Sequence, residues 1–118
     1  NDYMANIGHW SLYGYGLWSV RIKDNNEYIG RVGIIKPAMF NEPDLAWQVF
    51  EAYEGKGYAY EAAIAVRDYT IENFNFSSLA SHILEGNKKS ILLAEKIGSK
   101  IKKEEVIDNK KFIVYFHI

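Results

Sequence analysis

The spacing of apolar residues changes partway along the chain, and this change limits the possible folds more than any other feature. In the first half, apolar and polar residues alternate or form short apolar runs, the pattern of β-strands. Residues 17–23 and 28–35 flank an Asp-Asn-Asn turn and are expected to pair as a hairpin, and residues 45–50 (LAWQVF) resemble a buried central strand. Gly30 and Gly33 inside the second strand indicate a bulge or a close backbone approach.

The second half of the chain adopts helical spacing. Helices are expected over residues 57–73 and 87–97, and strands over residues 79–84, 99–107 and 111–118. Asn87 is a good N-cap, and Gly98 is placed to end the second helix with a positive φ. The element order β-β-β-α-β-α-β-β predicts an α/β (α+β) fold, with a mixed, mostly antiparallel sheet flanked by helices.

Composition excludes several classes of protein. The 118 residues suit a single domain over residues 1–118, and 48% of them are hydrophobic, which excludes a disordered chain. The net charge of −1 gives no general attraction to nucleic acid or to a membrane surface, and we expect neither partner. The chain has no Cys, no signal-peptide pattern and no metal-like spacing among His9, His82 and His117, so we expect no metal.

A glycine loop between the central strand and the first helix is the best local anion site. Gly55 and Gly57 allow a tight turn with outward N–H groups, and the following helix N-terminus is positive. Lys56 adds a mobile charge at the rim of this loop. The spacing equally suits a purely structural connection, and it matches neither a P-loop nor the three-glycine Rossmann fingerprint.

Two segments together carry a family resemblance. The loop reads EGKGYA over residues 54–59, and residues 87–98 read NKKSILLAEKIG. In order and spacing, they resemble the motifs of the GNAT family (Gcn5-related N-acetyltransferases) over most of residues 8–107. Glu54 stands where that family usually has Arg or Gln. The phrases GHW, GYG and IGRVGI look most like the RimJ/RimL-like branch, which acetylates ribosomal-protein N-termini.

The resemblance implies where acetyl-CoA would bind. In the family, the strand before the glycine loop splays from its neighbour and the cofactor lies in the gap. A main-chain N–H near Val49 would polarise the thioester carbonyl, the loop amides would hold the pyrophosphate, and Asn87 would contact the sulfur end. The implied cofactor-binding residues are Val49, Phe50, Gly55, Lys56, Gly57, Tyr58, Ala59, Asn87 and Lys96.

The resemblance also implies three candidate catalytic residues, Asp44, Ser90 and Asn87. Asp44 matches the position of the general base, with Glu42 as its alternative. The sequence is equally consistent with both residues being solvated acids in a loop. Ala94 occupies the position where many family members have a Tyr acid, so Ser90 is the better proton donor, unless it merely assists the helix cap at Asn87. His82 is expected to pack within its strand.

The aromatic residues have two interpretations. Trp10, Tyr13, Tyr15, Trp18 and Trp47 are candidates to line an acceptor pocket, although Trp18 and Trp47 suit sheet packing better.

The resemblance implies an acetyl-CoA-dependent N-acetyltransferase that acts on a primary amine, either a protein N-terminus or a small molecule. The alternatives are a catalytically degenerate acyl-CoA-binding module and a non-enzymatic interaction domain. A cytoplasmic location and a possible homodimer are further expectations. In the family, a strand and two helices precede the first hairpin; the chain is expected to lack them, as an N-terminally truncated domain would.

Overall fold

The computed structural model describes residues 16–118, and of Ile101 only the backbone. The candidates His9, Trp10, Tyr13 and Tyr15 therefore lie outside the described residues. The elements are β1 (Leu17–Arg21), β2 (Tyr28–Ile35), β3 (Asp44–Val49), the short 3₁₀ helix η1 (Glu51–Tyr53), α1 (Tyr58–Asn73), β4 (Ala80–Leu84), α2 (Lys88–Lys96), β5 (Ile101–Ile107) and β6 (Lys110–Phe116).

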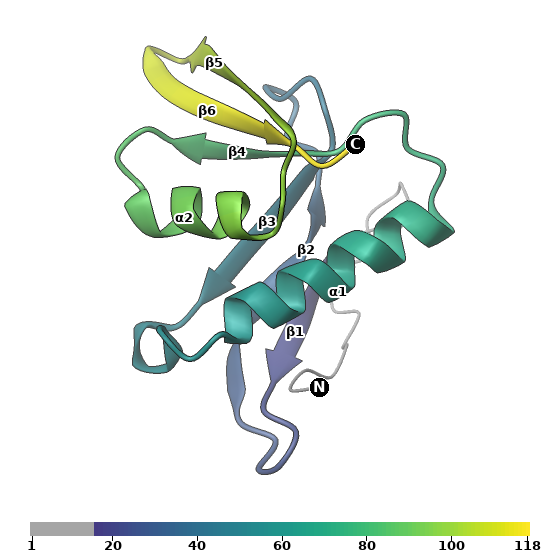
Figure 1. Ribbon diagram of the computed structural model, residues 1–118, viewed down its shortest axis with the longest axis vertical. Helices are drawn as coiled ribbons and strands as arrows, with labels where there is room; N and C mark the ends of the chain where they lie inside the picture. The colour runs from purple at the N-terminus through teal and green to yellow at the C-terminus, as the bar shows by residue number, and fades with distance from the viewer. Residues whose placement is uncertain (1–15) are drawn as a thin grey trace.

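The strands form one six-stranded sheet in the order β1-β2-β3-β4-β6-β5 (Figure 1). Every neighbouring pair is antiparallel except β3 and β4, which run parallel because α1 connects them. This arrangement confirms the predicted mixed, mostly antiparallel sheet and the predicted order of elements. Only η1 was not predicted from the sequence.

The turns and glycines follow from backbone sterics. The β5–β6 hairpin turns through Asp108 and Asn109, which both have positive φ, a conformation that Asp and Asn tolerate better than most residues. The interpretation of Gly30 and Gly33 as points of close approach is confirmed. A Cβ at Gly30 would lie 2.1 Å from the carbonyl oxygen of Gln48 on β3, and one at Gly33 would lie 2.1 Å from that of Gly16.

Both helices cover the same face of the sheet (Figure 1). The small residues Ala62 and Ala63 of α1 are buried against Leu45 of β3, and Ala94 of α2 is buried against Ile83 of β4. Alanines at these positions let the helix backbones approach the strands closely. Among residues 16–118, no helix is long and apolar enough to cross a membrane.

Candidate functional site

The two parallel strands β3 and β4 separate almost as soon as they meet. Their pairing is confined to Asp44 and Ala80, where the Ala80 N–H donates to the Pro43 carbonyl at 3.1 Å. One step further on, the buried hydroxyl of Ser81 donates to the Leu45 carbonyl at 2.7 Å. Beyond this contact the strands diverge, as Figure 1 shows. The predicted splay of the strand before the glycine loop is therefore present.

The backbone of β3 is oriented toward this gap. The Leu45 carbonyl is directed toward β4, whereas the Phe50 N–H is directed toward β2, where it donates to Ile29 at 2.8 Å. Peptide groups of successive strand residues point alternately to the two edges. Trp47 and Val49 therefore direct their N–H groups into the gap, as the oxyanion prediction for Val49 requires.

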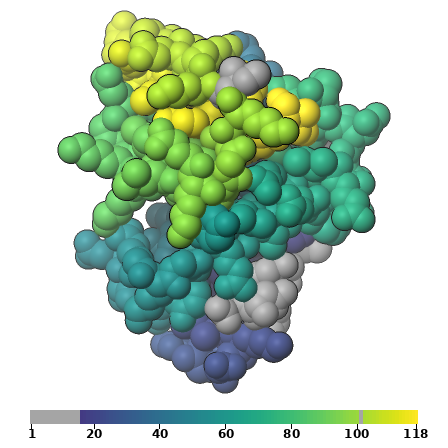
Figure 2. Space-filling model, in the orientation of Figure 1, coloured from purple at the N-terminus to yellow at the C-terminus, as the bar shows by residue number. Residues whose placement is uncertain are grey.

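A cleft of about 640 Å³ occupies the gap and extends to the start of α1. In Figure 2 this face is hollowed between the green surface of α2 and the teal surface of the segment before α1. Besides predicted residues, the lining includes Trp47, Gln48, Tyr53, Glu54, Tyr60, Lys89, Leu92 and Leu93. The lining combines apolar side chains with backbone donors and two lysines, which is typical of a ligand site.

The glycine loop leaves the start of α1 open. Gly55 and Gly57 have φ values of 78° and 83°, which favour glycine, and no atom lies within 4 Å of a Cβ built on either residue. Gly57 is the N-cap of α1 and supplies no side-chain cap. The N–H groups of the first turn are therefore left for a ligand or water. This geometry fits the pyrophosphate of CoA.

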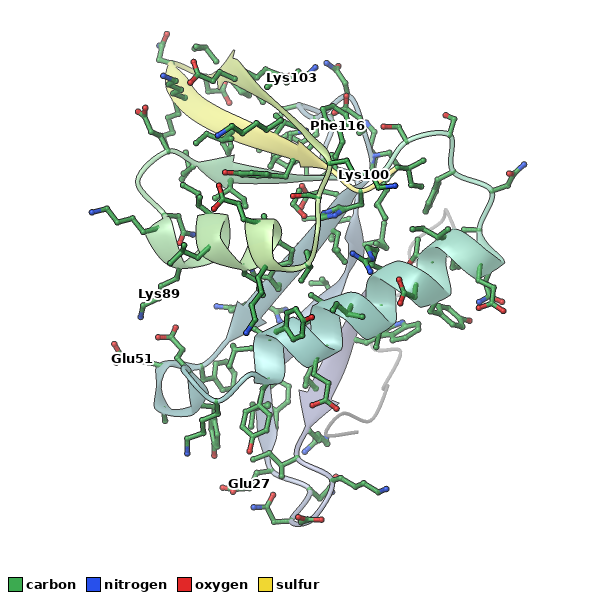
Figure 3. The ribbon with its side chains drawn as sticks, viewed as in Figure 1. Glu27, Glu51, Lys89, Lys100, Lys103 and Phe116 are labelled. Carbon is green, nitrogen blue, oxygen red and sulfur yellow. The ribbon has the colours of Figure 1, made fainter. Side chains whose placement is uncertain are left out.

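An ion pair spans the mouth of the cleft. Lys89 Nζ on α2 lies 2.5 Å from Glu54 Oε1 on the loop before α1, and this hydrogen bond raises the pKa of Lys89. Figure 3 shows Lys89 reaching from α2 toward the segment that carries Glu51. Deeper along α2, Lys96 Nζ lies 4.5 Å from the centre of the Tyr60 ring. Both lysines line the cleft, so two positive charges lie along its wall.

The N-terminus of α2 contributes a polar pair to the cleft. The Asn87 side chain accepts a hydrogen bond from the Ser90 N–H at 3.3 Å, which confirms Asn87 as the predicted helix cap. The Ser90 hydroxyl accepts a hydrogen bond from the Trp47 indole N–H at 3.1 Å. Trp47 therefore does more than pack in the sheet, since its indole bridges β3 and α2 across the gap.

Asp44 lies on the other face of the sheet, because side chains alternate along β3 and Trp47 faces the cleft. Asp44 is 5% exposed, and its Oδ1 lies 2.6 Å from the His82 backbone nitrogen and 2.7 Å from its Nδ1. Burial raises the pKa of the Asp44 carboxyl. The interpretation of Asp44 as a solvated loop acid is thus wrong.

His82 forms the centre of this buried cluster. Its side chain is fully buried, its Nε2 lies 3.1 Å from Glu42 Oε1, and Phe40 stacks on the ring at 3.9 Å. His82 packs within the sheet, as expected, but it also joins the two candidate base residues. Sequence spacing gave no signal for this cluster because it depends on the register between β3 and β4.

The cleft brings together most of the predicted site residues. They are Val49, Gly55, Gly57, Tyr58, Ala59, Asn87, Ser90 and Lys96. Phe50, Lys56 and Asp44 are not among the lining residues, and Phe50 instead packs edge-on against Tyr28 with ring centres 5.2 Å apart. In the described part of the chain, no group of three or more His, Asp or Glu side chains is arranged to hold a metal ion.

Comparisons with known proteins agree on one family. Residues 1–100 match the family model described as "Acetyltransferase (GNAT) domain". A relative from Bacillus subtilis (strain 168), named "Uncharacterized protein YkkB", is 36% identical over 105 residues, or 87% of this chain and 61% of the relative. The chain thus spans less than two thirds of that relative's length.

Solved structures show the same similarity. The acetyltransferase from Agrobacterium tumefaciens str. C58 matches with a TM-score of 0.79 and 33% identity, over 92% of this chain and 64% of that one. A ribosomal-protein-S5-alanine acetyltransferase from Vibrio fischeri matches with a TM-score of 0.69 and 19% identity, over 88% of this chain and 61% of that one. The second match is a likeness of fold alone.

Proposed function

Because the chain belongs to the GNAT acetyltransferase domain family, we propose that it transfers an acetyl group from acetyl-CoA to the nitrogen of a primary amine. The observation that carries this proposal is the cleft where β3 and β4 part, with the open glycine loop at one end and Ser90 beside it. The amine is either a peptide N-terminus, as in the RimJ/RimL-like branch, or a small molecule.

The cleft offers a partner for each part of acetyl-CoA. The N–H groups of the glycine loop and of the first turn of α1 would hold the pyrophosphate, with Lys89 and Lys96 nearby for phosphate charge. The open edge of β3 at Trp47 and Val49 would bond the pantetheine arm. Asn87 and Ser90 would lie at the sulfur end. Lys56 and Phe50 do not line the cleft, so only their backbone groups are proposed to contact the cofactor.

The reaction needs donors for two developing negative charges. A neutral amine attacks the thioester carbonyl carbon, the C–N bond forms, and the C–S bond breaks with its electron pair on sulfur. The Val49 N–H would stabilise the oxyanion. The Ser90 hydroxyl would donate to the departing sulfur, and the proton that the amine loses leaves through water.

Asp44 or Glu42 is the proposed acceptor of the amine proton. Since Asp44 is buried and bonded to His82, it would act through an intervening group rather than by touching the amine. Glu42 is the more accessible of the two, with 13% of its side chain exposed.

A thermal-shift titration with acetyl-CoA tests the binding step. Acetyl-CoA at about 100 times its dissociation constant should stabilise the fold by about 2.7 kcal/mol. Gly57→Asp should abolish the shift, because a carboxylate would face the phosphates. Gly98→Asp is the matched control, since Gly98 has the same φ of 83° and open space but lies outside the cleft. No shift for the folded wild-type chain would refute the proposal.

Release of free CoA in the presence of an amine panel tests the transfer step. A chain that binds acetyl-CoA but releases no CoA with peptide or small amines would be an acyl-CoA-binding module instead. The buried Ala94, at the position where many family members have a Tyr acid, favours that second candidate.

A further inference from the structure

Within residues 16–118, a side-chain hydrogen bond between Trp47 and Ser90 joins β3 to the start of α2 across the cleft. The indole Nε1 lies 3.1 Å from the Ser90 hydroxyl oxygen, and both residues line the cleft. The two residues are 43 positions apart in the sequence. Their contact therefore depends on the packing of α2 over the gap.

The chemistry of the two groups fixes the direction of this bond. An indole N–H can donate but not accept, so the Ser90 hydroxyl is the acceptor. A serine hydroxyl has one hydrogen of its own, and in the described residues that hydrogen is given to no acceptor. A helical serine often donates back to a carbonyl of the preceding turn, as Ser99 does to Ala94 at 2.8 Å. Ser90 does not.

Both partners are held in place by their surroundings. The Trp47 ring packs against the core between α1 and strands β1 to β3. It also packs against the smaller cluster of Ile83, Ala94 and Tyr115. The Ser90 backbone is fixed by the Asn87 cap. Neither side chain can turn freely, so the oxygen of Ser90 keeps its orientation and its hydrogen is left for the cleft.

We propose that Trp47 is a positioning residue that holds the Ser90 hydroxyl as a donor toward the leaving sulfur of the thioester. This inference rests on the proposed acetyl transfer. As the C–S bond breaks, the sulfur takes the Ser90 proton, and the proton that the amine loses passes through water to Asp44 or Glu42. Ser90 then regains a proton from solvent water, to which that carboxyl returns its own. The indole stabilises the serine oxygen while it passes the proton, because its N–H points at that oxygen.

Single and double substitutions test this coupling. Trp47→Phe keeps the ring packing but removes the N–H; it should lower kcat about tenfold and leave the dissociation constant of acetyl-CoA unchanged. Ser90→Ala should lower kcat about a hundredfold. In the Ser90→Ala background, Trp47→Phe should have no further effect. Ser99→Ala is the control, because it removes a side-chain hydrogen bond of 2.8 Å to Ala94 outside the cleft lining, and it should leave kcat unchanged.

The outcomes separate the two levels of the proposal. Suppose that the wild-type chain releases CoA. If Trp47→Phe then leaves kcat unchanged, or lowers kcat by the same factor in the wild-type chain and in Ser90→Ala, the positioning role alone is overturned. If the wild-type chain neither binds acetyl-CoA nor releases CoA, the proposed function fails and the positioning role fails with it.

Two readouts do not depend on the folding of Trp47→Phe. Hydrogen exchange of the Trp47 indole proton should be slow in the wild-type chain and fast in Ser90→Ala. Ser90→Thr keeps the hydroxyl, so it should restore both the protection of that proton and most of kcat. Failure of either readout would also overturn the positioning role.

Discussion

The contact that closes the narrow end of the cleft is the Ser81 hydroxyl, and its removal should cost substantial stability. Ser81 is 2% exposed and donates its only hydrogen to the Leu45 carbonyl at 2.7 Å. The second bond of this hydroxyl, to His117 Nε2 at 2.8 Å, must therefore be donated by the histidine. Ser81→Ala would leave both the Leu45 oxygen and the His117 nitrogen buried without this partner.

The magnitude follows from these two groups. Leaving a buried polar atom unsatisfied costs about 1–3 kcal/mol, and the Nδ1 of His117 already has no partner among the described residues. Because His117 is 9% exposed and keeps some access to water, we expect Ser81→Ala to lower the free energy of unfolding by about 2–3 kcal/mol, the lower part of the sum for two such groups. With an unfolding entropy of about 2.1 cal/mol/K per residue, the Tm should fall by about 8–12 °C.

Thermal denaturation followed by circular dichroism is the assay, with Ser99→Ala as the matched control. The Ser99 hydroxyl donates to the Ala94 carbonyl at 2.8 Å, and Ser99 is only half-buried. Its removal should cost about 1 kcal/mol or less. If Ser81→Ala lowers the Tm no more than Ser99→Ala does, the strands are not held together by this hydroxyl and the reasoning is wrong.

Three further predictions concern titration, affinity and backbone packing. Burial lowers the pKa of His117 from 6.5 to about 4, so the unfolded chain binds a proton that the folded chain does not between those values. The contribution of His117 to stability should thus be full above pH 6.5 and fall as the pH drops toward 4. In His117→Gln, the Tm should decline less over this pH range than in the wild-type chain. An equal decline in Tm in both proteins would contradict this prediction. Glu54→Gln frees Lys89 and removes a negative charge at the cleft mouth, so calorimetry should show that acetyl-CoA binds a few-fold more tightly. The control is Glu104→Gln, which breaks a distant ion pair with Lys111 and should leave the affinity for acetyl-CoA unchanged. Gly30→Ala would place a Cβ 2.1 Å from the Gln48 oxygen and should destabilise the fold by about 3 kcal/mol or more in urea unfolding; a loss under 1 kcal/mol would show that β2 and β3 separate easily.

The elements were predictable because local chemistry determines them. The alternation of apolar and polar residues predicted the strands, and alanines at helical spacing predicted α1. Asn87 and Gly98 predicted the two ends of α2. The glycine loop was also predictable, since its positive φ values demand glycine. These signals are all contained within a few neighbouring residues.

The side-chain contacts across the gap were not predictable, because they join residues far apart in sequence. The interpretation of Trp47 as sheet packing was reasonable from its strand, yet its indole reaches Ser90 on α2. Likewise, Asp44 looked like a loop acid beside Pro43, and only the pairing with β4 buries it against His82. A shift of register by one residue would put each of these side chains on the opposite face.

Three contacts follow the gap from its closed end to its mouth, and their burial decreases in that order. Ser81 to Leu45 is buried, Trp47 to Ser90 is half-buried, and Glu54 to Lys89 is exposed to solvent. Since buried contacts open least often, the narrow end should stay closed while the mouth opens to admit a ligand. Substitutions at the three positions should therefore affect different quantities. Loss of the first contact should reduce stability, loss of the second should reduce turnover, and loss of the third should change affinity.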